Sequence, residues 1–503
     1  MQHRSIFGYL AKQLHERPDS DAYVYHGGRT TFRELHDGAS RLAGALKAHG
    51  VQPGDRVAMV MQDSIELVLT ILASMGMGAI AVPINPALSE LDICHVVNDC
   101  GARILFVSEA YLDVTLTLKP ELKSVQEIVT TGSARQGGIA FSRMMESENS
   151  QELLDQDGPA FIVYTSGSTG RPKGALHHHS DICCVVEAIG RQVYEIQPSD
   201  RMFSASRTPF AYGFGNTIGF TIGFGTPMIL LSERPTPDSI AKTFAEFDPT
   251  IFFAVPAVFR NILEFRRQGG VFSAKSLKFS AAGGENLPPQ TFNEWKEFTG
   301  TPILETIGST ELLHGYITNQ KQRIKLGSTG LAVPGYDIKL IDDKGIAGER
   351  GVLFVKGGSA FRRYWNDDKK TQETIIDGYV RSGDIYRRDE EGFYFFEGRA
   401  DDMFKSSGMW VSPVDVEDVL RGHPEVNEAA VVGIPAADGT FEVTAFVSLR
   451  SSGKAQEQVI EELHELSSSK LPRYKRPKQI RVIAELPRNP TGKVQRFKLR
   501  TTA

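Results

Sequence analysis

The sequence predicts an α/β protein with a large N-terminal domain of helix-covered, mostly parallel sheets and a small β-rich unit, followed by a small α+β C-terminal domain. In the first half of the chain, short apolar runs alternate with helical patterns, which is typical of parallel strands joined by helices. From about Ile338, short strands and turns replace this alternation and indicate the smaller β-rich unit. The 503 residues are too many for one ordinary core.

The expected elements follow one another along the chain. The stretch from Leu67 to Ser89 is charge-free, but Gly76, Gly78 and Pro83 interrupt it, so a helix ending near residue 75 and a short strand explain it better than a membrane span. The expected strands are 57–61, 79–82, 103–107, 160–164, 251–255, 277–281, 352–356, 393–396, 429–432, 443–449 and 479–483. The expected helices are 65–74, 91–98, 257–267, 414–421 and 458–467.

Composition and charge exclude several classes of protein. With 41% hydrophobic and 23% charged residues, the chain is neither disordered nor fibrous. A net charge of -5 argues against nucleic acid as a general partner. The four cysteines form no paired C-x-x-C pattern and the N-terminal apolar run is too short for a signal peptide, so we expect a cytoplasmic protein. The segment from Lys470 onward is basic, either as a solvated face or as a landing site for phosphates.

A loop rich in glycine and hydroxyl groups follows the expected strand 160–164. It reads Tyr-Thr-Ser-Gly-Ser-Thr-Gly-Arg-Pro-Lys-Gly from Tyr164 to Gly174. The glycines let backbone N–H groups converge on anionic oxygens, and Lys173 adds a point charge. Lys173 stands between a proline and a glycine, so the spacing of a P-loop NTPase is not met. A solvated Ser/Gly linker is the structural alternative to a polyphosphate loop.

Three later passages carry residues that suit nucleotide chemistry. Thr310 and Glu311 follow a likely strand and suit phosphate and Mg²⁺, although an exposed turn explains them equally well. Asp384 and Arg399 offer a carboxylate for ribose hydroxyls and a guanidinium for phosphate, or a surface salt bridge. Lys493 follows a glycine turn near the C-terminus, where most lysines are simply solvated.

In this order the passages resemble those of the adenylate-forming superfamily of acyl-CoA synthetases, nonribosomal peptide adenylation domains and luciferases. The resemblance implies a domain 1–400 for the acid and ATP, a hinge at Asp401, and a mobile domain 401–503 that carries the adenylation lysine. It also implies ATP, Mg²⁺ and coenzyme A. The implied nucleotide and thioester residues are Thr165, Ser166, Gly167, Ser168, Thr169, Gly170, Lys173, Gly284, Glu285, Thr310, Glu311 (also the metal ligand), Asp384, Arg399, Gly408 and Lys493.

Within the superfamily, the chain is most similar to benzoate-CoA ligases and their hydroxy- and aminobenzoate relatives. The passages that carry this similarity are 210–216, 308–314 and 408–413. By the match, the acid would be lined by Ala211, Tyr212, Gly283, Gly284, Ile307 and His314. An aromatic wall beside small residues suits a flat ring, while packing alone would also explain Tyr212 and His314. Gly283 departs from the alanine usual in this subgroup, and the missing methyl would enlarge the pocket.

The expected function is therefore an ATP-dependent acid-CoA ligase that activates benzoate or a substituted benzoate through an acyl-adenylate, releasing AMP and pyrophosphate. A cinnamate-like or a short- or medium-chain fatty acid is the alternative substrate. An amino-acid-activating enzyme is disfavoured because no aspartate stands near Ala211. A luciferase-like oxygenase and a non-catalytic binding protein are further alternatives. The expected partners are the acid, ATP and CoA, without nucleic acid or a membrane span, and a homodimer is left open.

Overall fold

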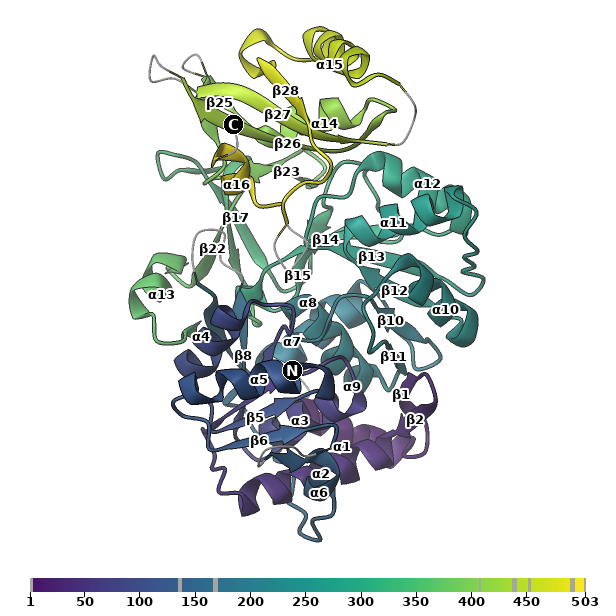
Figure 1. Ribbon diagram of the computed structural model, residues 1–503, viewed down its shortest axis with the longest axis vertical. Helices are drawn as coiled ribbons and strands as arrows, with labels where there is room; N and C mark the ends of the chain where they lie inside the picture. Colours follow the sequence, from purple (N-terminus) through teal and green to yellow (C-terminus); the bar gives the residue numbers. More distant parts are fainter. Residues whose placement is uncertain are drawn as a thin grey trace. The chain divides into compact units, whose positions relative to one another are not determined.

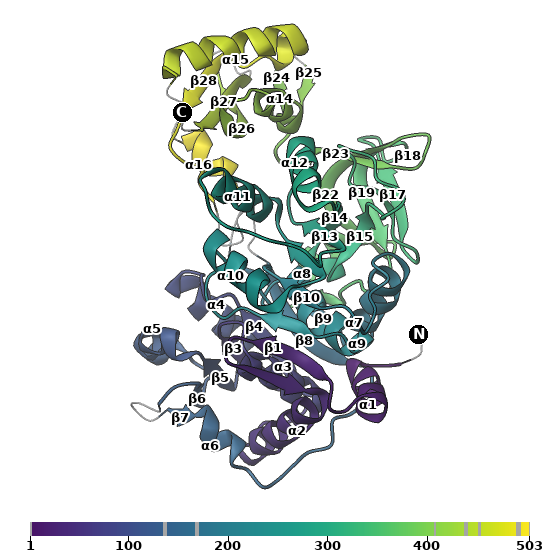
Figure 2. The same cartoon turned by 90° about the vertical axis from the view of Figure 1, so that its right-hand side faces the viewer.

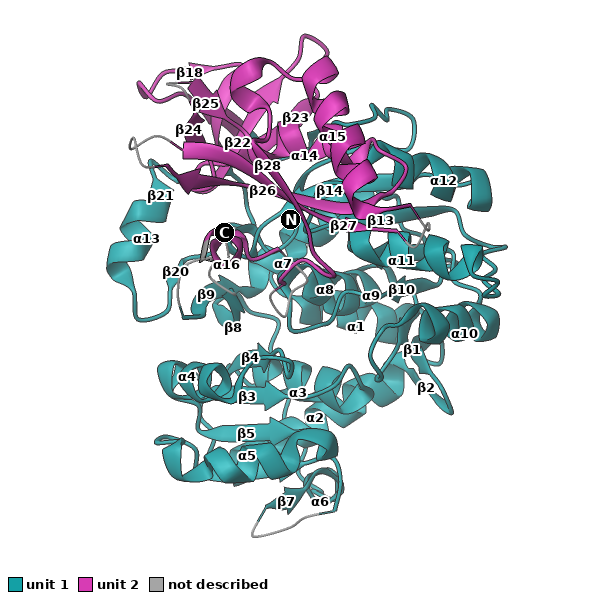
Figure 3. Ribbon diagram, turned by 45° about the horizontal axis from the view of Figure 1, so that its top comes forward, with its two compact units in different colours: residues 1–337, 355–380 teal, residues 338–354, 381–503 magenta. Residues whose placement is uncertain are grey.

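The computed structural model describes residues 3–133, 138–165, 171–406, 409–436, 441–450, 454–488 and 494–501. The chain divides into two compact units, one formed by 1–337 with 355–380 and the other by 338–354 with 381–503 (Figure 3). Both units mix helices and strands, so the expected α/β class is confirmed. Among the described residues, no helix has the length and hydrophobicity needed to cross a membrane.

The first sheet of unit 1 has eight strands in the order β20-β9-β8-β4-β3-β5-β6-β7. Strands β3 to β8 pair in parallel, whereas β9 runs antiparallel to both β8 and β20. The bounds are β3 Arg56–Val60, β4 Ile80–Ile84, β5 Ile104–Val107, β6 Glu127–Thr130, β7 Ile139–Ala140, β8 Pro159–Thr165, β9 Lys173–His178 and β20 Arg363–Tyr364.

Helices α3 (Ile65–Gly76) and α4 (Glu90–Cys100) join the parallel strands of this sheet. Each begins at a serine whose hydroxyl accepts a backbone N–H of the first turn, and α4 ends at Gly101 with φ 61°. The sheet core packs apolar strand residues against α4. The stretch from 67 to 89 thus forms α3 and β4, as expected, because its glycines and Pro83 end the helix and start a buried strand.

The second sheet of unit 1 has nine strands in the order β16-β15-β14-β13-β12-β10-β11-β1-β2. Its centre is parallel, and β2, β15 and β16 are antiparallel to their neighbours. The bounds are β1 Asp21–Tyr25, β2 Gly28–Thr31, β10 Met202–Ser204, β11 Met228–Leu230, β12 Ile251–Ala254, β13 Phe279–Gly283, β14 Ile303–Gly308, β15 Gly315–Thr318 and β16 Leu331–Ala332.

Three helices cover one side of this sheet: α10 (Pro237–Phe247), α11 (Pro256–Arg267) and α12 (Pro289–Thr299) (Figure 1). Each starts with proline at its first position, where the missing N–H costs nothing. Their inner faces form an aromatic core in which Trp295 meets Phe259 edge to face at 4.9 Å. This rigid layer fixes the ends of β12, β13 and β14, where several expected site residues lie.

Two interrupted helices lie between the two sheets of unit 1 (Figure 2). One runs through α7 (His179–Val185) into a π-helical turn η3 (Val186–Arg191), and the other through α8 (Ala211–Phe214), the π-helical turn η4 (Gly215–Phe220) and α9 (Thr221–Phe224). Phe214 stacks on Phe161 of β8 at 4.3 Å, and Phe220 contacts Phe253 of β12. Because π-helical turns are rare and are frequent at functional sites, η4 is a candidate part of a functional site.

The remaining elements of unit 1 are short or peripheral. Helix α2 begins with a capping box in which Thr31 and Glu34 bond each other's backbone N–H. The bounds are α1 Ile6–Glu16, α2 Phe32–Ala48, η1 Glu109–Tyr111, α5 Leu112–Leu118, η2 Lys119–Glu121, α6 Phe141–Met145, η5 Thr310–Leu312, α13 Asp368–Thr374 and β21 Ile375–Ile376.

Unit 2 contains a β-hairpin and a compact α+β layer. The hairpin pairs β22 with β23, and the layer pairs β26 antiparallel with β27 and β27 parallel with β28, against α14 and α15. The bounds are β17 Asp337–Ile341, β18 Ala347–Gly348, β19 Arg350–Lys356, β22 Tyr379–Arg388, β23 Tyr394–Arg399, β24 Phe404–Ser406, β25 Met409–Val411, α14 Pro413–Arg421, β26 Val426–Pro435, β27 Phe441–Leu449, α15 Gln456–Lys470, η6 Arg473–Lys475, β28 Gln479–Val482 and α16 Arg496–Thr501.

Candidate active site

The expected phosphate loop lies in the sequence between the antiparallel strands β8 and β9. Thr165 and Lys173 face each other as the last pair of the two strands. Helix α4 anchors both flanks of the loop, because the hydroxyl of Tyr164 donates to Asp99 at 2.6 Å and His95 Nε2 donates to the carbonyl of Pro172 at 3.1 Å. The expected phosphate residues Ser166, Gly167, Ser168, Thr169 and Gly170 lie outside the described residues.

Glu311 and Thr310 occupy the short helix η5, between β14 and β15. One oxygen of Glu311 accepts a hydrogen bond from the hydroxyl of Tyr364, and its carbonyl accepts from the N–H of Phe361 at 2.7 Å. Burial, reinforced by the charge of Glu311, raises the pKa of Tyr364 well above its usual value. Tyr364 therefore stays a hydrogen-bond donor to one carboxylate oxygen of Glu311.

The buried side chain of His177 forms a hydrogen bond with the backbone of η5. His177 Nε2 lies 2.8 Å from the carbonyl oxygen of Thr310, and Nδ1 lies 2.9 Å from Asp181, whose other oxygen accepts from Arg362 at 2.8 Å. Carbonyl and carboxylate oxygens only accept, so His177 satisfies both contacts when both of its ring nitrogens carry protons. The side chains of His177 and Asp181 are fully buried. Together they form a hydrogen-bonded clamp on Thr310 that sequence analysis did not identify.

The residues expected to line the acid converge within unit 1. The rings of Tyr212 and His314 lie 4.9 Å apart between centroids, and the hydroxyl of Tyr212 donates to the carbonyl of Ala281 at 3.2 Å. Ala211 begins α8 and Ile307 ends the apolar part of β14. His314 is buried, and burial lowers its pKa to about 3. Tyr212 and His314 are therefore in direct contact, whereas Ala211 and Ile307 are placed only by the elements that carry them.

Two successive glycines, Gly283 at the end of β13 and Gly284 directly after it, differ in their backbone conformation and in the space around them. A Cβ on Gly283 would lie 3.4 Å from the ring of Tyr212, an ordinary contact distance, so the missing methyl leaves its space over that ring. Gly284 has φ 93°, in the region that side-chain-bearing residues rarely adopt. Gly284 thus turns the chain directly before Glu285.

Sequence analysis did not identify Asn216 of η4 as the hydrogen-bond partner of His314. Its side-chain oxygen lies 3.0 Å from Nε2 of His314. This close approach depends on Gly215, because a Cβ there would lie 2.6 Å from Cδ2 of His314. The available signal was a lone buried amide in the otherwise apolar run that follows Phe214.

In unit 2, the expected ribose residues are paired with each other. Asp384 and Arg399 are opposite neighbours in the β22–β23 hairpin, and the Arg399 guanidinium donates to Asp384 at 2.9 Å. The backbone N–H of Asp384 donates to the hydroxyl of Ser382. The expected hinge residue Asp401 lies in an exposed turn directly after β23. Gly408 and Lys493 lie outside the described residues.

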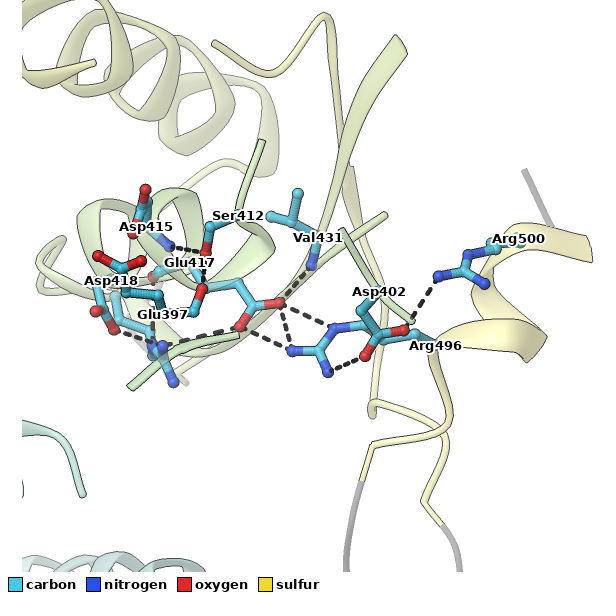
Figure 4. Close-up of polar contacts among 10 residues, drawn as sticks. Glu397, Asp402, Ser412, Asp415, Glu417, Asp418, Val431, Arg496 and Arg500 are labelled. Atoms are coloured by element: carbon cyan, nitrogen blue, oxygen red, sulfur yellow. Dashed lines mark hydrogen bonds and ion pairs between the residues drawn. The ribbon is translucent and has the colours of Figure 1, made fainter. Parts of the chain in front are cut away.

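A partly buried ion cluster joins Asp402, the residue after Asp401, to the C-terminal helix α16 (Figure 4). Arg496 donates to both oxygens of Glu417 at 2.8 and 3.0 Å and to Asp402 at 3.3 Å. Asp402 also accepts from Arg500 at 3.1 Å, and Glu417 accepts from the N–H of Val431 at 2.8 Å. Glu417 of α14 is the buried carboxylate of this cluster, and a buried carboxylate without its partner is costly, so Arg496 ties the start of α16 to α14 and to Asp402.

Two family models match the chain. The model described as AMP-binding enzyme matches residues 10–365, and the model described as AMP-binding enzyme C-terminal domain matches residues 415–493. Among curated relatives, the benzoate-CoA ligase of Thauera aromatica is 35% identical over 96% of this chain and 93% of the relative. The 3-hydroxybenzoate-CoA ligase of Aromatoleum sp. (strain CIB) is 31% identical over 98% of this chain and 94% of the relative.

Solved structures give the same picture. An anthranilate CoA ligase in complex with anthranoyl-AMP superposes with a TM-score of 0.94 at 32% identity, covering 100% of this chain and 98% of that chain. A benzoate CoA ligase from Burkholderia xenovorans LB400 superposes with a TM-score of 0.90 at 34% identity, covering 99% of each chain.

Proposed function

Because the chain belongs to the AMP-binding enzyme family, we propose that it is an ATP-dependent ligase that converts an aromatic carboxylate, benzoate or a substituted benzoate, to its CoA thioester. The observation that carries this proposal is the contact of Tyr212 with His314 beside Gly283, in a chain whose near-full-length relatives are named as ligases of benzoate and hydroxybenzoates. A flat ring fits between an aromatic wall and small residues.

In the first step, a carboxylate oxygen attacks the α-phosphorus of ATP, the bond to the β-phosphate breaks, and pyrophosphate leaves. The loop from Thr165 to Lys173 would hold the β- and γ-phosphates, and Thr310 would donate its hydroxyl to phosphate. Gly284, Glu285, Asp384 and Arg399 would hold the rest of the nucleotide. Lys493 would offset the negative charge that develops in the transition state.

Glu311 would hold Mg²⁺ in this proposal. No group of three or more potential metal ligands occurs among the residues that the structure describes. Mg²⁺ fits nonetheless, since it usually keeps several waters and binds through one or two carboxylates together with substrate phosphates. Glu311 keeps one oxygen available when Tyr364 donates to the other. When bound, the ion would neutralise charge on the phosphates.

In the second step, the thiol of CoA attacks the acyl carbon, and AMP leaves. We propose that domain 401–503 turns about Asp401 after adenylation, which withdraws Lys493 and brings the segment around Gly408 to the acyl-adenylate. Glycine at 408 would permit close approach of the pantetheine arm. The basic C-terminal segment would attract the phosphates of CoA. A cytoplasmic location, consistent with four free cysteines, and a homodimer are part of the same proposal.

Two coupled measurements test the proposal. Purified protein with ATP, Mg²⁺ and CoA is screened across benzoates, cinnamates and short fatty acids for pyrophosphate release and for loss of free thiol. We expect pyrophosphate only when an acid is present, fastest with benzoates, and loss of thiol only when CoA is also present. Acid-dependent pyrophosphate release without a thioester would contradict the ligase assignment, and faster turnover of fatty acids would contradict the aromatic substrate.

A further inference from the structure

The segment 360–366, here called the connecting segment, contacts both parts of the expected phosphate site. Its strand β20 pairs antiparallel with β9, the strand that leaves the phosphate loop. The N–H of Trp365 donates to the carbonyl of Gly174, near the start of β9, at 2.7 Å. In the same segment, the N–H of Phe361 donates to the carbonyl of Glu311 in η5 at 2.7 Å. The connecting segment therefore links η5 to a flank of the loop.

Helix α4 holds the end of the connecting segment through the same residue that holds β8. The carbonyl of Asp99 accepts from Nε1 of Trp365 at 3.2 Å and from the side-chain amide of Asn366 at 2.8 Å. The carboxylate of Asp99 accepts from the hydroxyl of Tyr164 in β8 at 2.6 Å. Asn366 has φ 54°, a backbone conformation that asparagine tolerates better than most residues. Several separate contacts thus fix the segment relative to both flanks of the loop.

Tyr364 extends this link from the backbone of η5 to the side chain of Glu311. The ring of Tyr364 is buried and packs edge to face on Phe361, with the centroids 4.8 Å apart. The backbone N–H of Tyr364 donates to the hydroxyl of Thr371 at 2.9 Å. With the residue held in this way, its hydroxyl donates to one carboxylate oxygen of Glu311, a residue that is only partly buried. Tyr364 therefore restrains an acidic side chain that solvent still reaches.

Restraint of this carboxylate matters for a bound cation. An unrestrained glutamate side chain populates several rotamers, and ordering it around an ion costs free energy. A hydrogen bond that already holds the carboxylate reduces this cost. Loss of such a bond to a metal-ligating group typically weakens metal affinity by about 10-fold to 100-fold.

We propose that the connecting segment fixes Glu311 relative to the flanks of the phosphate loop, and that Tyr364 is the positioning residue that orients the Glu311 carboxylate for the Mg²⁺ of ATP. This inference rests on the proposed function, in which Glu311 holds Mg²⁺. Tyr364 acts through Glu311 alone. Its contribution should therefore appear in the part of ATP binding that depends on Mg²⁺, and it should disappear when Glu311 no longer holds the ion.

The experiment measures ATP binding to the full chain without any acid, so that no adenylation occurs. Titration calorimetry gives the Kd of ATP with EDTA and with Mg²⁺, and the readout is the first constant divided by the second. In the wild type this ratio should exceed one. In Tyr364→Phe, which keeps the ring and removes the hydroxyl, the ratio should fall by at least about threefold, while the Kd with EDTA stays within about twofold of the wild type.

Two comparisons separate the orientation of the carboxylate from general packing. Tyr9→Phe is the matched control, because the buried Tyr9 donates its hydroxyl to Glu187 at 2.6 Å in the same unit. Its ratio should stay that of the wild type. In a Glu311→Gln background, Tyr364→Phe should lower the ratio no further, because the group through which it acts has lost its charge.

A second variant tests the other end of the connecting segment. The double variant Trp365→Phe/Asn366→Ala removes both donors to the carbonyl of Asp99 and leaves Tyr364 in place. Its ratio should fall by at least about twofold, because small displacements of a binding group are costly. This variant decides the question if Tyr364→Phe does not fold.

The outcomes distinguish this inference from the proposed function. An unchanged ratio in Tyr364→Phe, or an equal fall in Tyr9→Phe, overturns the role of Tyr364, and an unchanged ratio in the double variant overturns the role of the connecting segment. A wild-type ratio of one overturns the assignment of Mg²⁺ to Glu311 and this inference with it. If the ratios behave as expected but no acid supports pyrophosphate release, only the proposed ligase activity is overturned.

Discussion

The buried imidazole of His314 ties the stability of the protein to pH. Its pKa is lowered by burial to about 3, against about 6.5 in an unfolded chain. Between these values the unfolded chain binds a proton that the folded one does not, so the free energy of unfolding falls as the pH falls below about 6.5, by up to ~1.4 kcal/mol per pH unit. His179, with a pKa lowered by burial to about 4, adds to the same loss.

Urea unfolding of the wild type and of His314→Phe between pH 7.5 and 5 checks this. As the pH falls, the free energy of unfolding should decrease less steeply in the variant than in the wild type. The difference in slope should correspond to about one proton, because the variant has no imidazole at this position to protonate on unfolding. Parallel curves for the two proteins would contradict the prediction. His179→Gln serves as the comparison, since it should remove the pH dependence that His179 contributes and leave the contribution of His314 in place.

At the residue scale, the sequence did not predict the hydrogen-bond partners of two expected site residues. The resemblance implied that Tyr212 and His314 both line the acid; their rings are in contact, and their role in binding the acid stays a prediction. The partner amide of Asn216 was not predicted, because its meaning depends on a π-helical turn and on Gly215, and neither has a clear sequence signature. Tyr364 was missed for a similar reason: it comes from a two-residue strand more than fifty positions beyond Glu311.

The short helix η5 depends on its clamp, and removing the clamp should impair adenylation. Asp181 offers one oxygen to His177 and the other to Arg362, whereas the amide of Asp181→Asn keeps only one acceptor oxygen. One of the two donors then faces an NH2 group, so His177 is held less firmly against the carbonyl of Thr310. We expect kcat for pyrophosphate release to fall by about tenfold or more, with little change in KM for the acid, because small displacements of catalytic groups are costly.

The control for this prediction is His49→Gln, which breaks another histidine–carboxylate pair of 2.7 Å, with Glu127 in the same unit. It should change kcat little. A rise in KM for the acid with unchanged kcat in Asp181→Asn would contradict a role of the clamp in positioning η5. Equal losses of kcat in both variants would indicate general destabilisation.

At the level of elements, the periodicity of apolar residues predicted strands and helices correctly, but it did not predict the π-helical turns. All strands and helices that the sequence predicted are present, with ends shifted by a few residues, because buried strands and amphipathic helices carry strong patterns. Helices α1, α2, α10 and α12 and the hairpin of β1 and β2 were not predicted. The π-helical turns follow from packing between two sheets, which no local pattern encodes.

For the whole molecule, the sequence predicted the superfamily correctly, and the family models and full-length relatives confirm it. The division at residue 400 and the hinge at Asp401 remain predictions. The ion cluster around Arg496 could not be predicted from the sequence, since Asp402 and Arg496 are 94 positions apart and meet only through the fold of unit 2. That cluster is the structural reason to expect the C-terminal segment to act together with the hinge.

In the two proposed conformations, Lys493 is at the site during adenylation and withdrawn during thioester formation. The rates of the two half-reactions should therefore respond differently to its removal. Lys493→Ala should lower the rate of pyrophosphate release by about 10²-fold to 10³-fold, the loss typical of one group that stabilises transition-state charge. Thioester formation from a supplied acyl-adenylate and CoA should stay within about threefold of the wild type, because the lysine would be withdrawn in that step. Lys498→Ala, a lysine of the same segment, controls for the loss of positive charge. Equal losses in both half-reactions would rule out two separate conformations.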